Sequence, residues 1–275
     1  MTTKNVSLRI AVFLFMTLVV LVSLFPFYWM FITAVKPLDE IFLFPPRLWP
    51  SQFNWGNFAK SMQVADFGTY FKNSTIVTIV ATVITVTINL LAGYAFAKYK
   101  FKGKEFFFLL VFSTLMIPMQ AVMIPNFIIA SRLGIRNTFI GLILPPCAEA
   151  FGLYMSRAFC TEIPDELIEA GRIDGATEFN IFTRIIVPNV KPLISVLVIF
   201  TVMWRWNDFQ WPLIMVSNSK LYTVQLGISV LNGVHYVDWN DLMSASLIAT
   251  LPIVAVFLIF QKHFVQGLVS SGIKG

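Results

Sequence analysis

Residues 165–192 read DELIEAGRIDGATEFNIFTRIIVPNVKP, a polar amphipathic stretch between two strongly apolar segments. Apolar and small residues recur in it at helical spacing, and Gly175 offers a backbone position that turns sharply. Pro164 suits the first turn of a helix, and Asp165 and Glu166 come next, at the positive end of its dipole. The stretch therefore predicts a short helix, a turn and a second short helix between two membrane spans.

The rest of the chain has the composition of a membrane protein. Of its 275 residues 57% are hydrophobic and only 12% are charged, whereas soluble proteins have about 25% charged residues. We therefore expect an all-α integral membrane protein with one transmembrane domain over residues 1–275. Proline interrupts several apolar segments, which favours a bundle of kinked helices. Six segments are long enough to span a bilayer, and they lie near 10–34, 73–97, 106–130, 138–159, 192–214 and 243–266.

The orientation follows from a lysine cluster after the second segment. Lys98, Lys100, Lys102 and Lys104 fall in one short connection, which places that connection in the cytoplasm. An even number of spans then puts both termini and the loop at about 161–190 in the cytoplasm too. The net charge of +6 comes from basic residues scattered through short loops. This scatter is typical of topology signals, and we expect no nucleic acid as a partner.

The charge of the loop separates two interpretations of it. Between Arg157 and Lys191 there are four basic and six acidic residues. An amphipathic linker lying on the inner leaflet should be basic, because that leaflet is anionic. A net negative loop favours the other interpretation, in which the loop fits the groove of a soluble partner.

A set of small, acidic and apolar residues in this loop resembles the EAA loop of binding-protein-dependent ABC importer permeases. The resemblance covers nearly the whole chain and is strongest to the shorter, MalG-like permease subunit of the carbohydrate-uptake group. Gly171 and Val187 depart from the alanine and leucine that are usual in the family. The matching positions are Glu169, Ala170, Gly171, Asp174, Gly175, Ala176, Ile185 and Pro188.

This resemblance implies a MetI-like, type I ABC importer permease fold with six spans, in a bacterial or archaeal cytoplasmic membrane. It implies a sister permease, two ATPase subunits, an extracellular or periplasmic sugar-binding protein and a sugar substrate. The EAA loop would be the coupling helix that sits in a cleft of the ATPase. The chain has no GxxxxGK[ST] phosphate loop. We therefore expect ATP and Mg²⁺ in the ATPase subunits, no cofactor here and no enzymatic activity.

Polar and aromatic residues inside the spans are the candidates for a solute path. Ionisable groups within a membrane are costly and indicate function by default. Aromatic faces suit the C–H surfaces of sugars, and amides or carboxylates suit their hydroxyls. Interhelical packing is the alternative role for each of these residues. The candidates are Gln120 and Asn126 in the third span, Glu149 in the fourth, and Trp204, Arg205, Trp206, Asn207, Asp208 and Trp211 in the fifth.

Spacing and residue type add expectations for these candidates. Arg205 and Asp208 lie three residues apart on one helical face, which predicts an ion pair. Arg205 is essentially the only basic residue in the path, and this scarcity favours neutral sugars or a uronate. His235 and His263 are far apart, so no metal-ligand cluster is predicted.

Three other classes of protein remain open. An ion-coupled secondary carrier would usually show two internal repeats, and the halves of the chain show no convincing similarity. A membrane enzyme would use Glu149 or Asp208, but the sequence places no second carboxylate or nucleophile beside either residue. An ABC permease for a non-sugar solute is the third, and the sequence does not name the solute.

Overall fold

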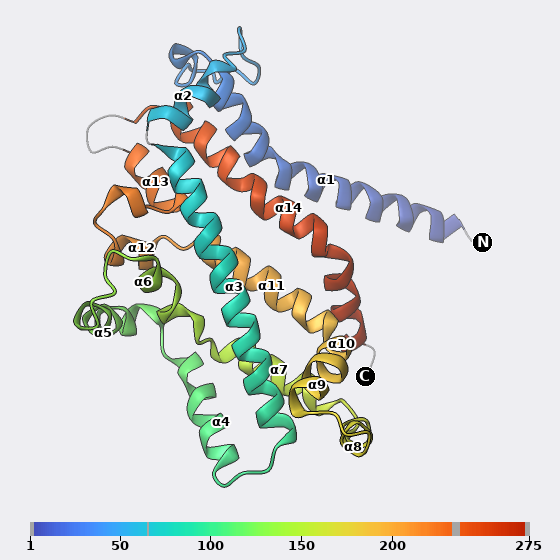
Figure 1. Cartoon of the computed structure of the whole chain (residues 1–275). Coiled ribbons are helices and arrows are strands. Elements are labelled where there is room, and N and C mark those ends of the chain that lie inside the picture. The colour runs from blue at the N-terminus through green and yellow to red at the C-terminus, as the bar shows by residue number, and fades with distance from the viewer. Residues whose placement is uncertain (1–2, 65, 233–236, 273–275) are drawn as a thin grey trace. The chain divides into compact units, whose positions relative to one another are not determined.

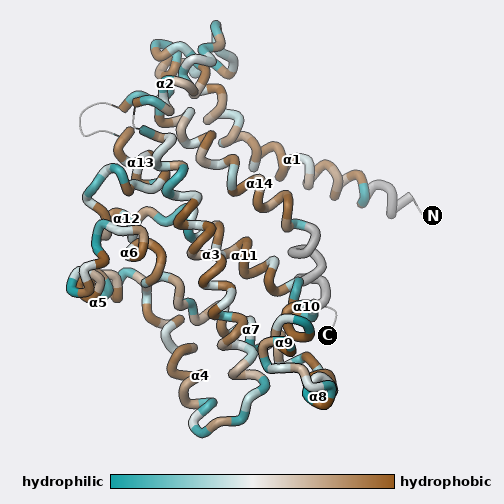
Figure 2. Tube along the Cα trace, viewed as in Figure 1, coloured by the Kyte–Doolittle hydropathy of each residue, from teal (hydrophilic) through white to brown (hydrophobic). Residues whose placement is uncertain are grey.

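The computed structural model describes residues 3–64, 66–232 and 237–272, and within those ranges it consists of helices and connecting loops with no strand (Figure 1). The predicted all-α class is confirmed. Three described helices are long and apolar enough to cross a membrane without a break. They are α1 (Thr3–Val35), α3 (Phe67–Lys98) and α14 (Trp239–Gly272), and Figure 2 shows how hydrophobic residues run along α1 and α3.

Three further apolar segments are pairs of helices with a sharp bend. The first joins α4 (Lys104–Ser113) and η2 (Thr114–Met116) to α5 (Met119–Arg132) at 109°. The second joins α6 (Phe139–Ile143) and η3 (Pro145–Cys147) to α7 (Ala150–Thr161) at 48°. The third joins α9 (Glu178–Ile181), η4 (Phe182–Ile186) and α10 (Val187–Asn189) to α11 (Lys191–Trp206) at 82°. If each pair is one span, the described residues hold up to six spans. Five lie near the predicted positions, whereas the pair Glu178–Trp206 begins inside the loop at 161–190, earlier than the predicted span at 192–214.

Proline explains where the first of these bends lies. Pro118 lacks a backbone N–H, and it disfavours the helical conformation of the residue before it. Ile117 is accordingly extended, with φ −91° and ψ 118°, and α5 begins directly after the proline. The expected kink in the third span is present, but at 109° it reverses the direction of the chain more than a kink in a straight crossing would.

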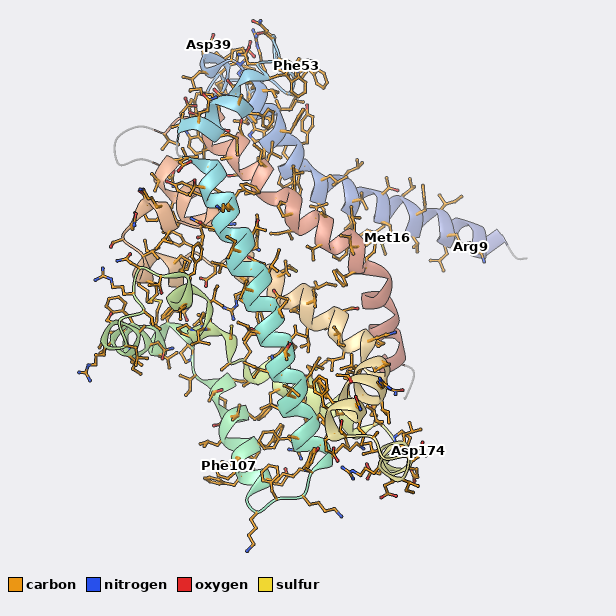
Figure 3. All side chains as sticks on the ribbon, viewed as in Figure 1. Arg9, Met16, Asp39, Phe53, Phe107 and Asp174 are labelled. Atoms are coloured by element: carbon orange, nitrogen blue, oxygen red, sulfur yellow. The ribbon has the colours of Figure 1, made fainter. Side chains whose placement is uncertain are left out.

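Apolar surface on α1 is largely uncovered by this chain. Large hydrophobic side chains from Leu8 to Phe27 are exposed, and Met16, labelled in Figure 3, is 55% exposed. Soluble monomers rarely expose a continuous apolar patch of this extent. A bilayer or a partner helix is the environment that would remove such surface from water.

The chain divides into two compact units. The first contains residues 1–68 and 227–251, and the second contains residues 69–226 and 252–275. In the first unit Lys36 is fully buried, with its ammonium over the ring of Trp29 and donating to the carbonyl of Arg47. The first unit also holds η1 (Leu38–Glu40) and α2 (Gly56–Val64), where Lys60 pairs with Asp238 at 2.6 Å.

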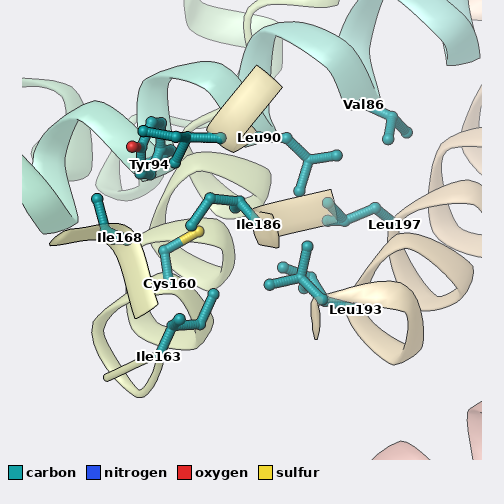
Figure 4. Close-up of a cluster of buried hydrophobic side chains, with 11 residues drawn as sticks. Val86, Leu90, Tyr94, Cys160, Ile163, Ile168, Ile186, Leu193 and Leu197 are labelled. Atoms are coloured by element: carbon teal, nitrogen blue, oxygen red, sulfur yellow. The ribbon is translucent and has the colours of Figure 1, made fainter. Parts of the chain in front are cut away.

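The second unit holds both candidate sites and is built around two apolar clusters. One cluster joins α3, α7 and α11 to the polar loop between them, and Figure 4 shows Leu90, Cys160, Ile168 and Ile186 converging in it. The other packs Trp211 and Met215 of α12 (Gln210–Met215) against α3 and α6. The cytoplasmic-loop candidates are therefore attached to the same core as the candidates in the spans.

Candidate coupling surface and solute path

The loop at 161–190 folds as the sequence predicts. It forms α8 (Asp165–Ile173), a turn, and α9, whose cap is Thr177. Gly175 has φ +75°, in the left-handed region that favours glycine. The N–H of Ala176 donates to the carbonyl of Gly171, and that of Gly175 donates to the carbonyl of Arg172. This is a Schellman end of a helix, and it explains why glycine follows Asp174 in the motif.

The inner face of the loop is built into the core. Ile168, Ile181 and Ile186 are buried in the cluster with Cys160 of α7. A Cβ added to Gly171 would lie 2.9 Å from Cδ1 of Ile185. The two motif positions therefore pack against each other, and the absence of a side chain at Gly171 lets α8 lie close to η4.

A cluster of polar side chains fixes the loop to the end of α3. Glu178 accepts hydrogen bonds from Arg172 Nε at 2.8 Å, from the Tyr99 hydroxyl at 2.5 Å and from the Tyr94 hydroxyl at 3.4 Å. These four residues are called the Glu178 cluster below. No local pattern predicts this cluster, because the tyrosines lie about 80 positions earlier in the chain than Glu178.

A second polar contact joins α3 to the start of α8. Lys98 Nζ donates to Asp165 Oδ1 at 2.6 Å and to the carbonyl of Ile163. The hydrogen bond from the Lys98 ammonium lowers the pKa of the Asp165 carboxyl. Lys98 belongs to the lysine cluster that predicted the orientation, and in the structure it also holds the loop.

The outer face of the loop is apolar and exposed. Ile173 is 86% exposed, Phe179 is 72% exposed and Leu167 is 44% exposed. Figure 3 shows the end of α8, at Asp174, at the edge of the second unit. Glu169, Ala170, Asp174, Gly175 and Pro188 are also on exposed positions, and Ala176 and Ile185 are half-buried. A single exposed apolar residue is ordinary, but several on two helices joined by one tight turn indicate a contact surface.

The candidates in the fourth and fifth spans form a buried ion pair that the sequence did not predict. Arg205 Nη2 lies 2.5 Å from Glu149 Oε1, and it also donates to the carbonyl of Pro146. The predicted pair of Arg205 with Asp208 is wrong. Helix α11 closes at Asn207, so Asp208 lies beyond it and the three-residue spacing no longer applies. Asp208 instead accepts from the backbone N–H of Trp211 at 3.1 Å, at the start of α12.

Two pairs of carboxamides lie at exposed or half-buried positions of the second unit. Gln120 Nε2 donates to Gln210 Oε1 at 3.3 Å, and Gln225 Nε2 donates to Asn207 Oδ1 at 3.3 Å. Gln225 belongs to α13 (Val224–Leu231), which lies between the fifth and sixth predicted spans, so it was not among the candidates. The structure thus brings the third and fifth segments together through amides, while Asn126 lies at an exposed position of α5.

The three tryptophans of the fifth span differ in exposure. Trp206 is buried and meets the ring of Phe71 edge to face, with centroids 5.5 Å apart. Trp211 is buried and donates from Nε1 to the carbonyl of Gly141 at 3.0 Å. Trp204 is 49% exposed. Within this chain only the ring of Trp204, among the three, presents a large face to its surroundings.

No group of three His, Cys, Asp or Glu residues is arranged to hold a metal ion in the described part of the chain. His235 and the side chain of His263 lie outside the described residues. Cys147 and Cys160 are free and buried.

Comparison with known proteins identifies the class of molecule that carries this loop and these spans. Residues 88–270 match the family described as binding-protein-dependent transport system inner membrane component. The chain belongs to this family, and its relatives are transport subunits, not enzymes.

Two relatives and one solved structure are similar over almost the whole chain. The arabinooligosaccharides transport system permease protein AraQ of Bacillus subtilis is 32% identical, over 97% of this chain and 96% of that protein. The sn-glycerol-3-phosphate transport system permease protein UgpE of Pectobacterium atrosepticum is 34% identical, over 92% of each. A chain of a bacterial ABC transporter that imports alginate superposes with a TM-score of 0.84 at 18% identity, over 96% of this chain and 99% of that one. The permease fold is therefore shown.

Proposed function

We propose that this chain is the transmembrane permease subunit of an ATP-driven sugar importer, with six spans and both termini in the cytoplasm. It would form half of the solute path, beside a sister permease, in a bacterial or archaeal cytoplasmic membrane. The observation that carries the proposal is the two-faced loop at 161–190, whose inner face belongs to the core and whose outer face is apolar and exposed. The similarity to AraQ over almost the whole chain supports a sugar as the cargo.

The outer face of the loop suits a groove on an ATPase subunit. Burying a side chain such as Ile173 or Phe179 stabilises a complex by about 1.5–3 kcal/mol. The carboxylate of Glu169, on the exposed side of the same helix, adds a charged contact. Since this chain has no phosphate loop, ATP and Mg²⁺ would be bound by two ATPase partners.

Because the loop is packed into the core, its movement is passed on to the spans. When ATP binding closes the ATPase pair, the exposed face moves with the groove that holds it. The buried face, with the Glu178 cluster and Lys98, forces α3, α7 and α11 to move as well. ATP and solute then influence each other, since both bind more tightly to one arrangement of the bundle than to the other. An extracellular binding protein delivers the sugar.

The polar groups of the path favour an uncharged, hydroxyl-rich solute. The charge of Arg205 is compensated within the chain by Glu149, and the Arg205 side chain is only 7% exposed. The path candidates at exposed positions are the carboxamides of Gln120, Asn126 and Asn207 and the indole of Trp204, and Gln120 bonds to the exposed Gln210. Amides and an aromatic face bind neutral sugars, whereas a phosphate ester or a uronate needs an uncompensated cation. We therefore assign a neutral oligosaccharide as the solute class.

The experiment is ATP-dependent uptake by the complex reconstituted in vesicles with its binding protein. Glu169→Ala should lower both uptake and the ATP hydrolysis that the binding protein stimulates. The matched control is Glu166→Ala, which removes an exposed carboxylate from the same helix but outside the motif. Uptake that needs no ATP, or a Glu169→Ala complex that works normally, would contradict the coupling role. Preference for a phosphorylated or acidic sugar would contradict the solute class alone.

A further inference from the structure

Helix α3 is the one long, unbroken span of the described chain without proline. Helices α1 and α14 contain Pro26 and Pro252, and the other three apolar segments are bent pairs. A helix without proline keeps all its backbone hydrogen bonds and transmits displacement with little bending. From Asn73 to Tyr94 it extends about 32 Å, at 1.5 Å per residue. Figure 1 shows α3 as a long, nearly straight helix.

Close packing makes α3 and α7 one rigid body. A Cβ added to Gly93 of α3 would lie 2.2 Å from Cβ of Ser156 in α7. A Cβ added to Gly152 of α7 would lie 2.0 Å from Nδ2 of Asn89 in α3. Each helix therefore places a glycine where the other approaches most closely. The two surfaces interlock at two points, one turn apart, and cannot slide past each other without a clash.

One end of this rigid body holds the coupling loop. The Glu178 cluster includes Tyr94, near the end of α3, and Tyr99, directly after α3. Lys98, the last residue of α3, bonds to Asp165 at the start of α8. The loop also follows α7 directly in the chain. A displacement of the loop therefore acts on α3 through two separate polar contacts and a shared apolar core.

The opposite end of α3 holds the segment that leads to the solute path. Asn73 is buried, and its Nδ2 donates to the carbonyls of Lys220 and Tyr222, both at 2.9 Å. The buried hydroxyl of Ser74 accepts from the N–H of Val224 at 2.8 Å. The next residue is Gln225, whose amide reaches Asn207. The backbone that positions this amide is thus fixed to α3 by three hydrogen bonds.

We propose that α3 carries the displacement of the coupling loop to the solute path, and that Asn73 and Ser74 are the positioning residues that make the path follow it. This inference rests on the proposed function, since it assumes that the loop is moved by an ATPase. Asn73 is the more important of the two, because both hydrogens of its buried amide are used on one short segment. No other residue type of that size supplies two such donors without a charge.

The first test separates coupling from assembly. Asn73→Ala should leave assembly and binding-protein-stimulated ATP hydrolysis intact, while the solute moved per ATP falls about tenfold, because both positioning hydrogen bonds are lost. Asn73→Asp should behave the same way, because a carboxylate cannot donate to the two carbonyls. The matched control is Thr75→Ala, whose exposed hydroxyl bonds only within α3. An unchanged solute-to-ATP ratio would overturn the inference, and so would hydrolysis and uptake falling in parallel.

The second test measures whether the contacts at both ends of α3 persist when the nucleotide state changes. Spin labels at exposed Thr75 and Ser219 report the path end, and labels at Thr75 and exposed Glu166 report the loop end. Each distance should be the same in the nucleotide-free and the ATP-bound complex. In Asn73→Ala, only the distance between positions 75 and 219 should change with nucleotide. A nucleotide-dependent change of either distance in the otherwise native chain would overturn the inference. A complex without ATP-dependent uptake would instead contradict the proposed function, before any variant is compared.

Discussion

Glu149→Gln should destabilise the protein strongly, although it changes only one atom. The Arg205 and Glu149 side chains are 7% and 14% exposed, and they are 2.5 Å apart. Removing one partner of a buried ion pair leaves an uncompensated charge, which costs about 3–5 kcal/mol. The carbonyl of Pro146 and the new amide oxygen still accept from Arg205, so we expect a loss near the lower limit, about 3 kcal/mol.

The double variant Glu149→Gln with Arg205→Met provides the decisive comparison. It removes both charges and keeps most of the volume, so it should cost less than the sum of the two single changes, with a remaining loss of about 1–3 kcal/mol because the carbonyl of Pro146 loses its donor. The assay is unfolding in detergent micelles, followed by tryptophan fluorescence, with the interaction energy taken from the double-mutant cycle. As a control, Glu105→Gln on α4 removes the exposed partner of Arg157, a residue of α7, and should cost no more than about 1 kcal/mol.

Two results would refute this reasoning. A loss below about 1 kcal/mol for Glu149→Gln would mean that the pair is solvated in the assembled protein. A double variant as unstable as the sum of its single changes would mean that the two side chains act independently. The single variant Glu149→Gln also tests the solute class, because an uncompensated Arg205 should make acidic sugars better inhibitors of uptake.

Three further predictions concern packing and the turn in the loop. Gly175→Ala should destabilise the loop by about 1–2 kcal/mol, because φ is +75° at this position, and Gly175→Asn should cost less. Hydrogen exchange of the loop amides measures both losses, and equal losses would contradict the conformational argument. Gly152→Ala should destabilise the protein by about 1–3 kcal/mol in the same unfolding assay, because its Cβ would meet Asn89 at 2.0 Å, and an unchanged midpoint would show that the helices separate easily. Trp211→Phe should lower the free energy of unfolding by about 1–3 kcal/mol, because the buried carbonyl of Gly141 loses its donor. The control is Trp204→Phe at an exposed position, and equal effects of the two changes would disprove the role of the hydrogen bond.

Local sequence signals were sufficient to predict the fold of the loop at 161–190. Its two helices follow from apolar residues at helical spacing, and its turn follows from Gly175, because glycine alone adopts positive φ without cost. The motif also reports real contacts, since Gly171 and Ile185 touch. These features lie within about 20 residues of one another, so the sequence contains the information directly.

Contacts between distant parts of the chain were not predictable in the same way. The partner of Arg205 is 56 residues away, and the nearer Asp208 was preferred because the end of α11 at Asn207 was not recognised. Proline marked the position of the bend before α5, but its angle of 109° could not be derived from the local sequence. The same holds for Gln225, since nothing in its local sequence indicates that α3 holds the preceding residue close to Asn207.

The central claim is that the exposed face of the loop docks on an ATPase, and Phe179 tests it most directly. This residue is 72% exposed, so a photoreactive side chain placed there leaves the core intact. In the assembled complex in vesicles, illumination should join this chain to the ATPase subunit. Cross-linking to lipid or to the sister permease, with none to the ATPase, would contradict the account and identify the loop as an interfacial linker.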